Sequence, residues 1–142
     1  MPAAAQFDHE KLDAYQIQLQ FIRWTSAFFE ELRDAKHRRI AEVLDQLDRA
    51  SLSVLLNIAE GNGRRASQQR VRFFDDARGS ATECAACLDA LIAKGAADVA
   101  RVLDGKALLL RVVSVLTKLI EWFTASPEER ARYGRVSEDE FE

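Results

Sequence analysis

The densest group of residues that could do chemistry is a set of arginines beside a glycine-rich connection. The run Gly61–Gly63 is followed closely by Arg64, Arg65, Arg70, Arg72 and Arg78. Arginine binds phosphate through a planar fork of N–H donors. The pattern therefore indicates a surface that contacts nucleic acid through Arg64, Arg65, Arg70 and Arg72. The structural alternative is a solvated helix start whose arginines pair with Asp75 and Asp76.

Two carboxylates, Glu60 and Glu83, are the candidates for acid–base chemistry. Such chemistry needs two carboxyl groups that are held close together and shielded from water. No histidine and no serine–base pair accompanies them in the pattern. We therefore favour a structural role, in which each carboxylate pairs with arginine or accepts backbone amides, over an enzyme. Asn57 ends an apolar run and is also interpreted as structural.

Cysteine and histidine offer no metal site in the sequence. Cys84 and Cys87 are three residues apart, but a structural zinc site usually has four ligands and a second pair is absent. A di-metal bundle needs Glu-x-x-His pairs, and neither His9 nor His37 follows a glutamate by three residues. We expect no metal and no cofactor, and the two cysteines are predicted to be small buried core residues.

The composition is that of one globular, helix-rich domain. Of the 142 residues, 48% are hydrophobic and 30% charged, and only six are glycine and two proline. The net charge is −3, but residues 126–142 hold six acids and three arginines, which leaves a balanced body of 17 basic and 17 acidic residues. No apolar stretch is long enough to span a bilayer. We therefore expect a cytoplasmic protein with no membrane partner.

Apolar residues recur at helical spacing along four segments. The periodicity predicts helices over residues 8–35, 40–61, 68–94 and 98–124. Gly61 is expected to end the second helix and Gly95 the third, and Ser67 is expected to cap the third helix. Four helices with short connections pack most simply as an antiparallel up-down-up-down four-helix bundle. The predicted fold class is therefore all-α.

The first predicted helix carries two apolar stripes. One is expected to face the core and comprises Leu12, Tyr15, Leu19, Ile22, Ser26 and Phe29. The other comprises Ile17, Phe21, Trp24 and Phe28. Together they are wider than one bundle core needs, so either this helix lies deep or the second stripe contacts another subunit. The second stripe is the candidate oligomer interface.

Glycine and proline mark further local features. Gly79 in mid-helix costs about 1 kcal/mol relative to alanine, and close approach of another backbone would compensate for that cost. Gly105 is expected to interrupt the fourth helix near its start. Ser126, Pro127 and Glu129 then form a new helix start with a capping box. The predicted division is a bundle over residues 1–125 and a charged, acidic C-terminal tail over 126–142 that contains this start.

Two motifs in the chain resemble the four-helix-bundle family of 23S rRNA intervening-sequence proteins. The first is Asn-Ile-Ala-Glu-Gly at residues 57–61, followed by Gly-Arg, and the second is an aromatic residue followed by Ala-x-Gly-Ser-x-x-Glu at residues 77–83. The resemblance covers residues from about 7 to 123, and both motifs fall in register with the predicted helices. The motif residues are Asn57, Glu60, Gly61, Gly79, Ser80 and Glu83.

This resemblance implies a bundle that assembles as a ring-shaped homopentamer. Relatives include accessory proteins of diversity-generating retroelements, which bind nucleic acid and a reverse transcriptase. The resemblance is also compatible with a buried polar network of Glu60, Gly79, Ser80 and Glu83 in place of a site. Nucleic-acid-binding relatives are strongly basic, whereas this chain has a neutral body.

Two functions stay open on the sequence. The first is a non-enzymatic, oligomeric nucleic-acid-associated or ribonucleoprotein accessory module, which the resemblance and the arginines favour. The second is a homo-oligomeric protein-interaction scaffold without a nucleic-acid role, which the neutral body, the wide apolar faces and the acidic tail favour. RNA, DNA and another protein are therefore all candidate partners.

Overall fold

The computed structural model describes residues 6–133 of the chain. Its long helices are α1 (Asp13–Glu31), α2 (Ala41–Gly63), α3 (Ser67–Ala93) and α4 (Val99–Thr124). The 3-10 helices η1 (Asp8–Lys11) and η2 (Arg33–Arg38) flank α1, and a short helix, α5 (Pro127–Tyr133), follows α4. Residues 6–133 contain no strand, so the predicted all-α class is confirmed.

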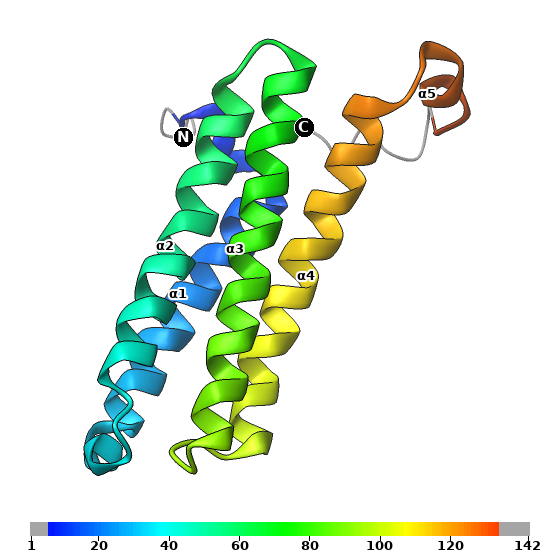
Figure 1. Cartoon of the computed structure of the whole chain (residues 1–142). Coiled ribbons are helices and arrows are strands. Elements are labelled where there is room, and N and C mark those ends of the chain that lie inside the picture. Colours follow the sequence, from blue (N-terminus) through cyan, green and yellow to red (C-terminus); the bar gives the residue numbers. More distant parts are fainter. Residues whose placement is uncertain (1–5, 134–142) are drawn as a thin grey trace, which may run out of the picture.

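The long helices form an antiparallel four-helix bundle, as predicted (Figure 1). Each packs mainly on two neighbours: α1 and α3 both pack against α2 and α4. Contact is most extensive between α2 and α3, which are joined by a connection short enough for antiparallel neighbours. The α2–α3 connection, the start of α1 and the end of α4 lie at the same end of the bundle (Figure 1).

The core is one continuous cluster of apolar side chains from the four long helices. Its largest fully buried members include Phe21, Phe28, Phe74, Leu47, Leu88 and Leu116. One buried polar side chain joins two helices inside this cluster: the Gln18 amide donates a 2.8 Å hydrogen bond to the Ser51 backbone carbonyl. Because a buried amide N–H without a partner costs stability, this bond favours one register of α1 along α2.

Helix α1 lies deep in the bundle, which is one of the two alternatives that the sequence leaves open, and its second stripe is the more deeply buried. Ile17, Phe21 and Phe28 are only 6, 0 and 1% exposed, and Trp24 packs against the core beside them. The stripe that was expected to face inward is mostly half-buried, and its Ser26 is exposed. The predicted oligomer interface of Ile17, Phe21, Trp24 and Phe28 is therefore wrong, because these side chains already pack in the core of their own chain.

Two helix ends near the α2–α3 connection differ from the prediction. Helix α2 continues past Gly61 to Gly63. Gly61 is buried, and a Cβ on it would lie 2.9 Å from the Phe74 ring, so glycine there permits close packing and does not end the helix. Ser67 is the first residue of α3, and the preceding residue, Ala66, provides no side-chain cap.

The connection between α3 and α4 agrees with the sequence. Gly95 follows the end of α3 with a φ of 72°, a left-handed conformation that glycine adopts without strain. Helix α4 begins directly after Asp98 and ends at Thr124, as predicted. The helix periodicity therefore located both ends of α4 correctly.

The two mid-helix glycines have the opposite environments from those predicted. Gly105 does not interrupt α4; it is buried, and a Cβ on it would lie 2.5 Å from the Trp24 ring. Trp24 in turn stacks between Phe21 and Phe28, with ring centroids 5.7 and 4.6 Å away. Gly79 is exposed and has no atom within 4 Å of an added Cβ. No other backbone within the described residues therefore lies close to Gly79. The close approach is found at Gly105, where the Trp24 side chain packs against the glycine.

The helix start predicted at Ser126 is confirmed. The Ser126 backbone N–H donates to Glu129 Oε2 at 2.9 Å, and the Glu129 N–H donates to Ser126 Oγ at 3.2 Å. Arg130 then turns back to the end of α4, where its guanidinium donates to the carbonyls of Trp122 and Phe123 at 2.9 and 3.3 Å. The last carbonyls of a helix lack partners within it, so Arg130 holds α5 against α4. The tail residues 134–142 lie outside the described part.

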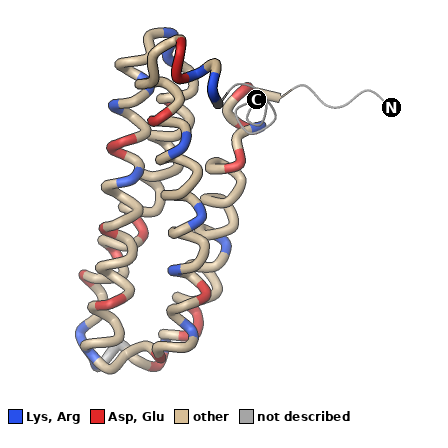
Figure 2. The backbone as a smooth tube through the Cα atoms, turned by 90° about the vertical axis from the view of Figure 1, so that its right-hand side faces the viewer, with Lys and Arg blue, Asp and Glu red and all other residues tan. Residues whose placement is uncertain are grey.

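No helix within residues 6–133 is both long enough and apolar enough to cross a membrane. Basic and acidic residues alternate along the length of the bundle (Figure 2). A charged surface, if it is to bind a partner, must therefore arise from a local group of residues.

Candidate functional site

Four arginines surround the connection between α2 and α3, and together they are called the arginine corner: Arg64, Arg65, Arg70 and Arg72. The first two lie between the helices, and the other two lie in the first two turns of α3. Successive helix residues are rotated by about 100°, so Arg70 and Arg72 project from different sides of α3. The corner therefore encircles the start of α3.

Aromatic rings hold two of these arginines. The Arg64 guanidinium lies 5.0 Å from the centroid of the Phe73 ring, and one of its nitrogens is 3.6 Å from Glu60. The Arg70 guanidinium lies 5.1 Å from the centroid of the Phe123 ring, and its Nε donates a hydrogen bond to the Arg64 carbonyl. A guanidinium that stacks on an aromatic ring still has N–H groups that can donate to a ligand. Because the side chain is already restrained, it loses less conformational entropy when it binds.

The guanidinium groups of the other two arginines are exposed and have no polar side-chain partner in the described part of the chain. Arg65 and Arg72 are exposed, and neither forms an ion pair or a side-chain hydrogen bond with residues 6–133. The structural alternative, pairing with the nearby aspartates, is seen for Arg78, whose guanidinium is 3.7 Å from Asp75. The N–H forks of Arg65 and Arg72 are therefore available to phosphate oxygens.

The local charge around the corner is positive. Residues 60–78 contain five arginines against Glu60, Asp75 and Asp76. One further acid is close, because the Asn62 amide donates a 3.0 Å hydrogen bond to Asp8 of η1. The corner is thus a modest excess of positive charge on an otherwise balanced body, placed at one end of the bundle (Figure 2).

The motif residues Asn57 and Ser80 join α2 to α3. Their link is Ser53, whose hydroxyl lies 3.0 Å from the Ser80 hydroxyl and accepts a 3.1 Å hydrogen bond from the Asn57 amide. These side chains are half-buried. Their contacts support the structural role predicted for Asn57.

The buried polar network expected from Glu60, Gly79, Ser80 and Glu83 is not present. Glu60 pairs with Arg64, Glu83 accepts a hydrogen bond from Gln46, and both glutamates are exposed, as is Gly79. The motif residues instead form separate contacts along the outer edge of the α2–α3 interface.

Glu60 and Glu83 are also too far apart to act on one substrate. Glu83 contacts Gln46, which lies fourteen residues before Glu60 in the same helix. At 1.5 Å per residue, the two positions on α2 are about 20 Å apart. Paired acid–base chemistry needs a separation below about 10 Å. The hypothesis of an enzyme that uses this pair of carboxylates is therefore wrong.

The two cysteines lie in the core. Cys84 is fully buried and Cys87 is 8% exposed, which confirms their predicted location. Burial raises the pKa of the Cys84 thiol to about 12, with a smaller contribution from Cys87. A thiol with such a pKa is protonated and unreactive at neutral pH. Among the side chains that the structure describes, which exclude those of residues 36, 37 and 133, no group of three or more His, Cys, Asp or Glu is placed to hold a metal ion.

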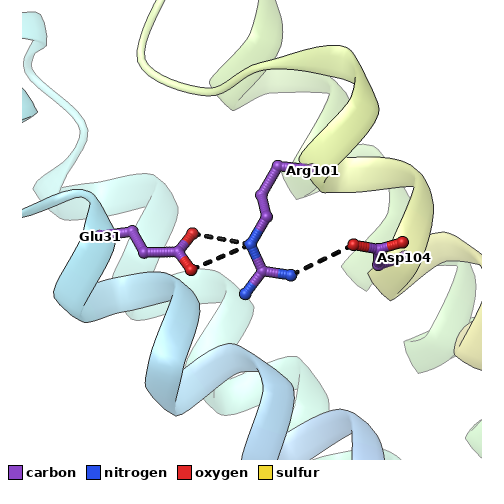
Figure 3. Close-up of polar contacts among 3 residues, drawn as sticks. All are labelled: Glu31, Arg101 and Asp104. Atoms are coloured by element: carbon purple, nitrogen blue, oxygen red, sulfur yellow. Dashed lines mark hydrogen bonds and ion pairs between the residues drawn. The ribbon is translucent and has the colours of Figure 1, made fainter.

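An ion pair that the sequence does not indicate joins the first and last long helices. Arg101 Nε lies 2.7 and 3.0 Å from the two Glu31 oxygens, and another of its nitrogens lies 3.4 Å from Asp104 (Figure 3). The guanidinium also lies 5.0 Å from the Trp24 ring centroid. The hydrogen bond that Glu31 accepts from Arg101 lowers the pKa of the Glu31 carboxyl group. The spacing of Arg101 and Asp104 is visible in the sequence, but nothing there indicates a partner seventy residues away.

A second feature that the sequence analysis missed is an exposed apolar stripe on α4. Val99, Leu103 and Leu110 are 54, 57 and 69% exposed. Their spacings of four and seven residues place the three side chains on one side of the helix. They are the apolar surface that α4 leaves uncovered in the single chain.

Comparison with known families gives a match over most of the chain. The family model described as 23S rRNA-intervening sequence protein matches residues 10–118, which is more than half of the chain. Searches of the curated proteins and of the solved structures found no match. The matched range contains α1 to α3, most of α4, both motifs and the arginine corner. The chain therefore belongs to the 23S rRNA-intervening sequence protein family.

Proposed function

We propose that this chain is a non-enzymatic nucleic-acid-binding bundle that contacts the phosphate backbone through the arginine corner. The observation that supports this proposal is the arrangement of the four guanidinium groups. Arg65 and Arg72 have open forks, and Arg64 and Arg70 beside them are held on aromatic rings. Because the name of the family refers to 23S rRNA, structured RNA is the first ligand to test, with a DNA duplex beside it.

The corner is suited to phosphate contacts and not to reading a base sequence. Arginine forks match phosphate oxygens, which carry no sequence information. Two of the four arginines lie in the connection and two on different sides of α3, so they do not line one helix face as a groove-reading helix would. Binding is therefore expected to depend strongly on salt and weakly on sequence.

The test is fluorescence anisotropy of labelled RNA and DNA titrated with protein at several salt concentrations. The variant Arg65→Ala with Arg72→Ala removes the two open forks and leaves the ring-held arginines in place. We expect it to bind about tenfold more weakly at low salt, with a salt slope smaller by about 2, because each lost phosphate contact lowers the slope by about 0.9 on duplex DNA.

The matched control is Arg111→Ala with Lys118→Ala, which removes two exposed cations from α4. It changes the net charge equally and leaves the corner intact, so it should bind almost as the unmodified chain does. Equal binding by the corner variant and the control would contradict the proposal.

We also propose that the chain self-associates and that the exposed stripe on α4 forms the contact between subunits. Val99, Leu103 and Leu110 are apolar and more than half exposed, whereas the α1 stripe first expected in this role is buried. Repetition of the bundle in an oligomer would also repeat the arginine corner. A neutral body can in this way gather several basic groups on one assembly. A cytoplasmic location remains part of this proposal.

A further inference from the structure

A small pocket lies next to the arginine corner, between the start of α3 and the end of α4. It is lined by Ser67, Gln68, Val71, Phe123 and Thr124 and has a volume of about 400 Å³. The ring of Phe123, which forms part of its wall, also holds the Arg70 guanidinium. An occupant of this pocket would therefore contact the same aromatic ring as Arg70 of the arginine corner.

Helix α5 is attached at the same place. Arg130 donates a hydrogen bond to the Phe123 carbonyl at 3.3 Å, and its guanidinium lies 5.7 Å from the centroid of the Trp122 ring. Tyr133, the last residue of α5, is three residues further on, about 5 Å along the helix axis. Arg130 therefore ties α5 to the end of α4, whose Phe123 lines the pocket.

The sequence beyond this point combines one aromatic residue with acidic neighbours. Residues 138–142 read Glu-Asp-Glu-Phe-Glu. The eight residue steps from Tyr133 to Phe141 span up to about 27 Å when extended. Arg130, three residues before Tyr133, contacts the carbonyl of Phe123, which lines the pocket, so a tether of this length allows Phe141 to reach the pocket. The acids are complementary in charge to the arginines beside it.

We propose that the segment Glu138–Glu142 binds to the arginine corner of its own chain, with Phe141 in the pocket and the acidic side chains against the arginines. The carboxylates occupy the positions that phosphate groups take, so the segment competes with nucleic acid. This competition rests on the proposed function, whereas the docking itself does not. A short tether gives an effective concentration in the millimolar range, so even weak contacts keep the segment docked for much of the time.

The docking is tested by nuclear magnetic resonance without any nucleic acid. The full chain is compared with Phe141→Ala and with the variant Asp139→Asn, Glu140→Gln and Glu142→Gln. We expect chemical-shift changes at the amides of Ser67, Gln68 and Val71 and at the arginine Nε–H groups of the corner, and we expect high salt to reduce the difference. Changes confined to residues 134–142 in both variants would overturn the docking.

The competition is tested by the anisotropy titration described above. Removal of three of the four acids of the segment should tighten nucleic-acid binding about fivefold at low salt, as expected when a weak intramolecular competitor at millimolar effective concentration is lost. The matched control is Glu42→Gln, Asp45→Asn and Asp48→Asn, three exposed acids of α2. It changes the net charge equally and should tighten binding much less.

The outcomes separate the two proposals. If the tail variant and the control bind equally while Arg65→Ala with Arg72→Ala still weakens binding, the competition is overturned and the proposed function stands. If no variant binds RNA or DNA at low salt, the proposed function fails, and the magnetic resonance comparison alone decides whether the segment docks.

Discussion

Gly105 determines how closely α4 can approach α1. An added Cβ would lie 2.5 and 2.6 Å from two atoms of the Trp24 ring. That ring cannot easily move, because Phe21 and Phe28 stack on it and Arg101 lies over it. We therefore expect Gly105→Ala to lower the free energy of unfolding by about 1–3 kcal/mol, the usual cost of overpacking a core, as measured by urea denaturation.

Gly79 provides the control for this measurement, since it is also a mid-helix glycine. An added Cβ there has no atom within 4 Å, so Gly79→Ala should gain helix propensity and raise the free energy of unfolding by up to about 1 kcal/mol. A rise in the free energy of unfolding for Gly105→Ala as well as for Gly79→Ala would contradict the packing described at Gly105. The sequence shows both glycines equally well and cannot distinguish them, because the difference depends on which side chain of another helix lies opposite.

The Glu31–Arg101 pair connects α1 to α4 at the element scale. Arg101 packs over Trp24 while it contacts Glu31 and Asp104 (Figure 3). We expect Arg101→Ala to lower the free energy of unfolding by about 1 kcal/mol through loss of stacking and packing. Arg101→Lys keeps the charge but loses the planar fork, so it should recover only part of this stability. Full recovery by lysine would contradict the importance of stacking.

The same pair predicts a dependence of stability on pH. The hydrogen bond from Arg101 lowers the pKa of Glu31 in the folded chain. A group whose folded pKa is lowered stabilises the fold above its unfolded pKa, and this contribution is lost as the pH falls through the folded value. The unfolded pKa of glutamate is about 4.3.

The measurement is thermal unfolding of the unmodified chain and of Glu31→Gln from neutral to acidic pH. The unmodified chain should have the higher Tm near pH 7, and the difference should shrink as the pH falls below about 4.3 and vanish once the pH is below the lowered, folded pKa of Glu31. A difference in Tm that is constant over this range would show that the charge of Glu31 does not contribute.

Helix positions could be predicted from the sequence because periodicity and end signals are local. The ends of α4 and the capping box at Ser126 were predicted correctly on these grounds. The more deeply buried stripe of α1 could not be predicted, because both stripes are apolar and periodicity does not say which one faces the core. The packing between helices determines which stripe is buried more deeply. Trp24 fits against Gly105 of α4, and these two residues are far apart in the chain.

At the scale of the whole molecule, the candidate site is partly visible in the sequence. The arginines of the corner and their glycine-rich connection could be identified directly. Their aromatic supports could not, because Phe123 is more than fifty residues from Arg70. The contacts of the motif residues also depend on how α2 and α3 pack, since Ser53 and Ser80 are twenty-seven residues apart. Such pairings arise from the antiparallel arrangement of the bundle and not from local spacing.

The exposed stripe on α4 gives a prediction about assembly. We expect the chain to sediment as an oligomer at micromolar concentration and Leu103→Gln with Leu110→Gln to dissociate it. Full burial of an exposed leucine side chain contributes about 1.5–3 kcal/mol, and these two are 57 and 69% exposed, so loss of both should raise the dissociation constant about a hundredfold. Circular dichroism should be unchanged, because both side chains are more than half exposed in the single chain.

The chain offers a matched control for this experiment on another helix. Leu52 and Leu56 of α2 are 51 and 53% exposed, so Leu52→Gln with Leu56→Gln makes the same chemical change outside the stripe. Sedimentation velocity of this control should equal that of the unmodified chain. Dissociation by the α2 pair and not by the α4 pair would place the subunit contact on α2, since only residues buried between subunits affect assembly. A monomeric unmodified chain at micromolar concentration would exclude the proposed self-association, and the arginine corner would then act as a single copy.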